Sequence, residues 1–115
     1  MLVNLLKSKI HRATVTDCHL HYEGSIGIDR VLMDAAGFIP YEQVDIYNIN
    51  NGERLTTYVI EEKADSGIIS IRGSAARKAE TGDLIIICSY CQMNLEEAKK
   101  FIPTKIKVNE KNKIK

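Results

Sequence analysis

Several residue types are scarce in this sequence, and their scarcity limits what the chain can be. Trp is absent and aromatic residues make up 6% of the 115 residues, so aliphatic side chains must fill the core. The three Cys cannot all pair within one chain, and a reduced state suits a cytoplasmic protein. No stretch approaches the roughly 20 apolar residues that cross a bilayer, and the first residues lack the features of a secretory signal. We therefore expect a cytoplasmic protein with no membrane partner.

Net charge is also small. Sixteen basic and fifteen acidic residues leave +1, which argues against nucleic acid as the main partner. The charge is uneven, however, because residues 99–115 hold seven Lys against one Glu. Such a stretch can bind RNA or a membrane surface. Because its Lys are interspersed with Ile, Val and Asn, we favour a solvated C-terminus and expect 109–115 to be a flexible tail.

Local patterns predict many short strands. Hydrophobic residues make up 44% of the chain, enough for the core of one small domain. The strongest turn signal is Asn51-Gly52, which lies between two β-rich runs and predicts a hairpin. Expected strands cover 9–16, 44–49, 54–60, 68–71, 84–93 and 105–108, with an extended stretch over 20–28 that is interrupted at 24–25.

Two short helices are expected among these strands. Asp29 is placed to cap a helix over 30–36, and Gly37 to end it. Asn94, with Glu97 three residues on, forms the pattern of a capping box before a helix over 95–101. The fold class predicted for residues 1–115 is therefore mainly β: a small β-barrel with short helices in a single domain.

Two groups of sulfur and nitrogen side chains invite a metal or redox interpretation. Cys88 and Cys91 have C-x-x-C spacing, but they lie inside an apolar strand, so we interpret them as core or wall thiols. In a strand, Cys18 points away from the face that His19 and His21 share. No metal site is expected from either group.

The arrangement of residues around Gly24-Ser25 carries more information than the dipeptide itself, which is an ordinary turn signal. Residues 9–16, Leu20 and 22–29 resemble the N-terminal signature of the bacterial aspartate 1-decarboxylases, pyruvoyl enzymes that make β-alanine. Further matches follow in register at 34–37, 51–54, 57–58, 73–76 and 82–83. The resemblance runs from residue 1 to about 108, and it implies a double-psi β-barrel.

The resemblance implies that the chain cuts itself between Gly24 and Ser25, giving 1–24 (β chain) and 25–115 (α chain). The Ser25 hydroxyl attacks the Gly24 carbonyl, and Ser25 ends as a covalent pyruvoyl group. Thr57 is the residue that assists processing. Because Gly24 lacks a Cβ, we expect it to adopt a φ that other residues resist.

The resemblance also implies a reaction and a binding site. The pyruvoyl group forms a Schiff base with L-aspartate, which loses CO2 and becomes β-alanine for pantothenate (coenzyme A) biosynthesis. Tyr58 donates the proton. Arg54, Lys9 and His11 form a cationic pocket for the dianionic substrate. Gly73, Ser74 and Ala75 line the pyruvoyl pocket. The family forms homotetramers with active sites between subunits. The sequence leaves open whether a maturation factor is needed as a further partner.

Two positions depart from the family's pattern. Arg72 stands where Asn is common, and an Arg side chain only donates hydrogen bonds whereas Asn also accepts them. Ser74 stands where Ala is usual. We hypothesise that Arg72 alters processing or substrate fit, or points away from the site. The alternative function is an unprocessed, non-catalytic β-barrel interaction module with a basic C-terminal tail.

Overall fold

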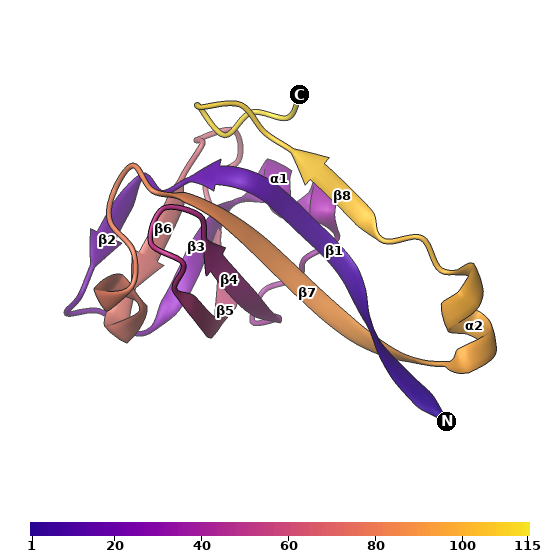
Figure 1. The fold of residues 1–115 in the computed structure, drawn as a ribbon. Coiled ribbons are helices and arrows are strands. Elements are labelled where there is room, and N and C mark those ends of the chain that lie inside the picture. Colours follow the sequence, from indigo (N-terminus) through magenta and orange to yellow (C-terminus); the bar gives the residue numbers. More distant parts are fainter.

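The computed structural model describes residues 1–115, and all eight strands belong to one mixed sheet (Figure 1). The sheet order is β2-β6-β3-β5-β4-β7-β1-β8. The strands are β1 (Leu2–Thr14), β2 (Asp17–His19), β3 (Ser25–Asp29), β4 (Gln43–Asn48), β5 (Arg54–Glu62), β6 (Ile69–Arg72), β7 (Leu84–Asn94) and β8 (Thr104–Lys107). The helices are α1 (Arg30–Ala36), the 3₁₀ helix η1 (Gly73–Arg77) and α2 (Leu95–Lys100). The predicted fold class, a small mainly-β barrel with short helices, is confirmed.

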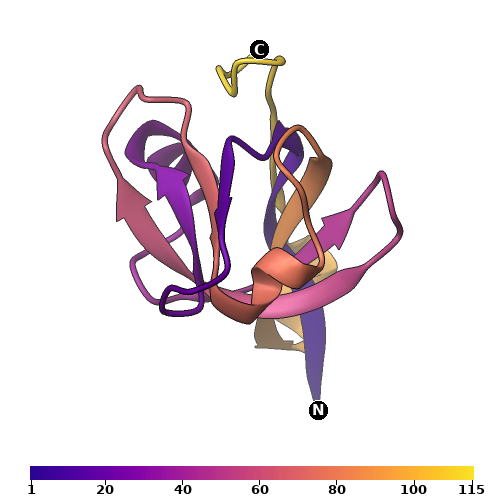
Figure 2. The same ribbon diagram turned by 90° about the vertical axis from the view of Figure 1, so that its left-hand side faces the viewer.

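Aliphatic side chains form the core, as the scarcity of aromatics requires. Eighteen buried apolar residues make one cluster. Ile is its most frequent residue, and Ile10, Ile26, Ile46 and Ile87 are each at most 1% exposed. β-branched side chains pack well on a pleated surface, and Figure 2 shows strands on the two sides of the molecule curving toward each other. β3 lies within this core, because all five of its residues are buried.

Local signals placed the helices and the hairpin well. The Asp29 carboxylate accepts a hydrogen bond from the Val31 amide at 2.8 Å, and α1 ends at Gly37 with a φ of 73°. The Asn94 side chain caps α2 by accepting from the Glu97 amide at 2.9 Å. β4 and β5 pair antiparallel across the predicted turn. Each of these elements is fixed by residues close together in sequence.

The first strand is longer than its composition predicts. β1 begins at Leu2 because it pairs with β7 as far as Asn94, and the two strands form an arm that extends away from the barrel (Figure 1). The extended stretch expected over 20–28 is a loop followed by a strand. β2 ends at His19, residues 20–24 form an exposed loop, and β3 begins at Ser25.

The C-terminal residues fold back onto the barrel. Asn112 is 1% exposed, and its side chain donates to the carbonyl oxygens of Thr14 and Gly67 at 2.8 Å each. Val108 and Ile114 form an isolated bridge. The segment 109–115 is thus anchored at one buried amide, and its flexibility stays a prediction. No helix has the length and apolar character needed to span a membrane.

Candidate active site

The Gly24–Ser25 bond lies where an exposed loop meets a buried strand. Gly24 is exposed, whereas Ser25 is 0% exposed and opens β3. The Ser25 hydroxyl donates a hydrogen bond to the Glu23 carbonyl oxygen at 3.4 Å. The hydroxyl therefore lies beside the Gly24–Ser25 peptide.

Gly73 brings η1 into contact with the residues before this bond. Its φ is 75°, and a Cβ built on it would lie 2.5 Å from Gly24 Cα and 3.0 Å from the Tyr22 carbonyl oxygen. Backbone cannot move aside cheaply, so only glycine permits this approach. Ser25 pairs with Arg72 across β3 and β6, which fixes the register of the contact.

The backbone conformation expected of Gly24 needs a correction. Gly24 is not among the residues with positive φ, and a Cβ added to it would meet only the Arg72 carbonyl oxygen, at 3.9 Å. The expectation of an unusual φ at Gly24 is therefore wrong. Gly73, which lies against Gly24, is the residue that has the left-handed conformation and no room for a Cβ.

A small pocket opens beside Gly24. Its volume is about 110 Å³, and its lining includes Thr57, Ser74 and Ala75 together with Arg72. β5 reaches this position because Ile26 of β3 pairs in parallel with Val59. The structure thus brings together four of the residues predicted for processing and pyruvoyl binding: Gly24, Thr57, Ser74 and Ala75.

Arg54 and Tyr58 lie on the other face of β5. Their cross-strand partners on β4 are Tyr47 and Gln43. The Arg54 guanidinium carbon is 4.3 Å from the centre of the Tyr47 ring, a cation–π distance. Lys9 belongs to the same face, because Lys9, Cys88, Asp45 and Thr56 pair in succession across β1, β7, β4 and β5. We call the face that carries Lys9, Arg54 and Tyr58 the cationic sheet face.

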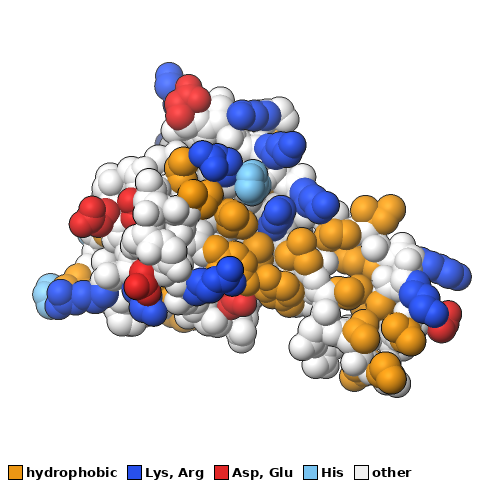
Figure 3. Space-filling view, viewed as in Figure 1, with side chains coloured by type: hydrophobic (Ala, Val, Ile, Leu, Met, Phe, Trp, Pro, Cys, Tyr) orange, Lys and Arg blue, Asp and Glu red, His pale blue; other side chains and the backbone are white.

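His11 lies at a different pocket from the one beside Gly24. It lines a pocket of about 400 Å³ with Arg12, Lys107 and Lys115 among others. Figure 3 shows Lys and Arg side chains gathered around a His on this side of the molecule. Burial, followed by the charges of Lys9, Arg12 and Lys107, lowers the pKa of His11. Within one chain, His11, Arg54 and Tyr58 are not among the residues that line the pocket beside Gly24, and neither is Lys9.

Two contacts of the predicted site residues were not predicted from the sequence. Tyr47 was not singled out, although the Asn51-Gly52 hairpin register could have placed it opposite Arg54. The ion pair of Arg72 with Glu62 had no such signal, because it joins β6 to β5 across the intervening β3. Only the sheet order brings these two side chains together.

The three cysteines are free, with Cys88 buried and Cys18 and Cys91 half-buried. Burial raises the pKa of Cys88 and of Cys18, which keeps both as unreactive thiols at neutral pH. Cys18 donates to the Ala79 carbonyl oxygen at 3.4 Å, and His19 Nε2 lies 2.6 Å from the Asp17 carboxylate. These side chains have local protein partners that account for their positions.

Comparison with known proteins identifies the class to which this fold and site belong. The family model for aspartate decarboxylase matches residues 1–115. An aspartate 1-decarboxylase of Syntrophus aciditrophicus is 60% identical over 111 residues, covering 96% of each chain. Those of Caulobacter vibrioides and Clostridium botulinum are each 53% identical, covering 100% and 99% of this chain and 98% and 90% of their own.

The fold and the comparisons together define a small β-barrel carboxy-lyase. The chain belongs to the aspartate decarboxylase family. The predictions of family and enzyme class made from the sequence are confirmed.

Proposed function

We propose that the chain decarboxylates L-aspartate to β-alanine and CO2, supplying pantothenate biosynthesis, after cleaving itself between Gly24 and Ser25. The observation that carries this proposal is the buried Ser25 hydroxyl beside a peptide bond that faces a pocket containing Thr57. A buried alcohol next to an exposed carbonyl is an arrangement suited to intramolecular attack, because proximity replaces a bimolecular encounter.

The cleavage uses only this chain's atoms and one water. Ser25 Oγ bonds to the Gly24 carbonyl carbon, the C–N bond breaks, and an ester with a free amine results. Loss of the Ser25 α-proton then expels the Gly24 carboxylate and leaves a dehydroalanine. Water hydrolyses its imine form, ammonia leaves, and residue 25 becomes a pyruvoyl group. Thr57 lies at the same pocket as Gly24 and can donate a hydrogen bond to the oxyanion of the first step.

The residues around Ser25 fit such a group. Ser74 and Ala75, two small residues, line the pocket beside Gly24, whose volume of about 110 Å³ suits a small planar ketone. The pyruvoyl ketone supplies the electron sink for loss of the substrate carboxylate. Arg54 binds a carboxylate through its planar fork, Lys9 adds positive charge, and Tyr58 delivers a proton to the substrate carbon.

The separation of these residues supports active sites shared between subunits of a homotetramer. None of Lys9, Arg54 and Tyr58 lines the pocket beside Gly24, so we infer that one chain does not present both groups to one aspartate. The cationic sheet face is also open, with Tyr90 46% exposed beside it. In the proposed assembly, this face of one subunit meets the pocket of its neighbour.

Conversion of L-aspartate by the purified protein tests the proposed function. We expect CO2 and β-alanine in a one-to-one ratio, with loss of activity after treatment with hydroxylamine, which captures ketones. D-aspartate is the matched control substrate and should give no product. A chain that stays whole after prolonged warming and releases no CO2 would contradict the proposal and favour the interaction module.

A further inference from the structure

Arg72 is held by more partners than any other side chain near the Gly24–Ser25 bond. Its guanidinium forms an ion pair with Glu62 and donates through Nε to the Ser70 hydroxyl at 3.2 Å. Ser70 in turn donates to the Asp17 carboxylate at 2.9 Å. Both charged side chains are largely buried, with 17% of Arg72 and 20% of Glu62 exposed. The guanidinium is therefore fixed by β5, β6 and β2 together.

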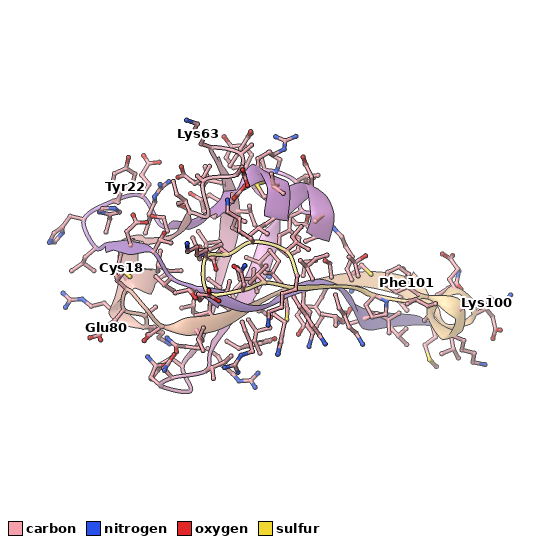
Figure 4. The ribbon with its side chains drawn as sticks, turned by 90° about the horizontal axis from the view of Figure 1, so that it is seen from above. Cys18, Tyr22, Lys63, Glu80, Lys100 and Phe101 are labelled. Carbon is pink, nitrogen blue, oxygen red and sulfur yellow. The ribbon has the colours of Figure 1, made fainter.

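The fixed guanidinium also contacts the loop before the bond. Its carbon lies 5.3 Å from the centre of the Tyr22 ring, within the range of a cation–π contact. His19 lies on the same ring, with the two centres 6.0 Å apart. Figure 4 shows Tyr22 on the loop at one end of the molecule, far from Lys100 and Phe101 at the other end. Tyr22 is 62% exposed, and its ring contacts are those with Arg72 and His19.

This contact acts on the less constrained side of the scissile peptide. Ser25 is fixed by β3, whereas Gly24 and the rest of loop 20–24 are exposed. The orientation of the Gly24 carbonyl therefore depends on what holds the loop. Glu62 is itself seated against β3, because a Cβ on Gly27 would lie 2.7 Å from its Oε1. The chain of contacts runs from the core through Glu62 and Arg72 to Tyr22.

The structure assigns Arg72 the role of a positioning residue: it clamps Tyr22 and so holds the Gly24 carbonyl at the pocket that contains Thr57. The inference rests on the proposed self-cleavage and adds the residues that set its rate. These contacts also explain how an Arg side chain is accommodated at residue 72, where the family commonly has Asn. The guanidinium is engaged by Glu62 and Ser70, and it acts on the bond through the loop.

The rate of cleavage tests this role. Chains isolated in the cold after brief expression are warmed, and intact chain is followed by denaturing mass spectrometry. Arg72→Lys keeps the charge but loses the planar fork, and Tyr22→Leu loses the ring. Each should slow cleavage about fivefold, the equivalent of one exposed cation–π contact. Tyr22→Phe keeps the ring and should cleave at the wild-type rate. Arg77→Lys, on an exposed Arg at the end of η1, is the matched control.

The double variant separates positioning from general damage. If Arg72 and Tyr22 act through one contact, Arg72→Lys with Tyr22→Leu should slow cleavage about fivefold rather than about 25-fold. If the two effects multiply in the double variant, or if both single variants cleave at the wild-type rate, the proposal that Arg72 acts through Tyr22 is wrong. Should Arg72→Lys not fold, the exposed Tyr22→Leu decides alone. A wild-type chain that never cleaves would overturn the proposed function, whereas normal wild-type cleavage with insensitive variants would overturn only the clamp.

Discussion

The pocket beside Gly24 and the cationic sheet face differ in how complete they are within one chain. The pocket gathers Gly24, Thr57 and Ser74 through pairing of β3 with β5 and β6, so its parts are held by the core. The cationic sheet face presents Arg54 and Lys9 on an open surface. Under the proposed function, a single chain makes its own electrophile and needs a neighbouring subunit to use it.

Ser25→Ala should have the largest effect, because it removes the attacking oxygen. We expect no cleavage and no β-alanine, with an unchanged fold, since the lost hydroxyl makes one long hydrogen bond at 3.4 Å. Denaturing mass spectrometry and circular dichroism measure the two outcomes. Cleavage of the Ala variant at the same bond would show that Ser25 is not the nucleophile.

Arg54→Ala should affect the other region. Cleavage should go to completion, because Arg54 is outside the pocket, while KM for L-aspartate should rise at least about tenfold with the loss of a charge-assisted carboxylate contact. Arg54→Lys keeps the positive charge but loses the planar guanidinium. Its KM for L-aspartate should therefore lie between that of the wild type and that of Arg54→Ala. A block in cleavage on losing Arg54 would contradict the separation of the two regions.

Mixing the two variants sharpens the comparison. Arg54→Ala chains carry an intact Ser25, and Ser25→Ala chains carry an intact Arg54. If active sites are shared between subunits, co-refolded mixtures should recover a fraction of the wild-type activity that neither variant shows alone at low aspartate. Steady-state rates at matched total protein measure this recovery. No recovery in mixed oligomers would place both residues in the site of one chain.

The two glycines of the pocket should respond differently to Ala. Gly73→Ala adds a Cβ against Gly24 at a φ of 75° and should lower the free energy of unfolding by about 1–3 kcal/mol. Gly24→Ala makes only an ordinary contact, at 3.9 Å from the Arg72 carbonyl oxygen, and should change the free energy of unfolding by less than about 1 kcal/mol. Urea unfolding of both variants, made in a Ser25→Ala background to prevent cleavage, provides the comparison.

The smallest expected effect is a pH dependence from His11. Its pKa is lowered in the folded state, so the unfolded chain binds more protons as the pH falls through the ordinary value of 6.5. The free energy of unfolding should therefore decrease as the pH drops below about 6.5. His11→Gln should weaken this dependence. A stability that rises on acidification through the same range would contradict the sign.

Elements fixed by residues close together in the sequence were predictable, whereas contacts between residues far apart in the sequence were not. The hairpin and the two α-helices were predictable, because Asn51-Gly52, Asp29 and Asn94 act within a few residues. Strand alternation also placed Arg54 and Thr57 on opposite faces of β5. The division of the site was not predictable, because the register of β3 beside β5 joins residues far apart in sequence. The Arg72–Glu62 pair was missed for the same reason.

The mass of the denatured, purified protein tests the central claim most directly. The account predicts two fragments, residues 1–24 with an ordinary C-terminal carboxylate and residues 25–115 with a pyruvoyl group in place of the N-terminal amine. Reduction with borohydride should add two hydrogens to the larger fragment alone. An intact chain with an unmodified Ser25 that still converts L-aspartate would contradict it.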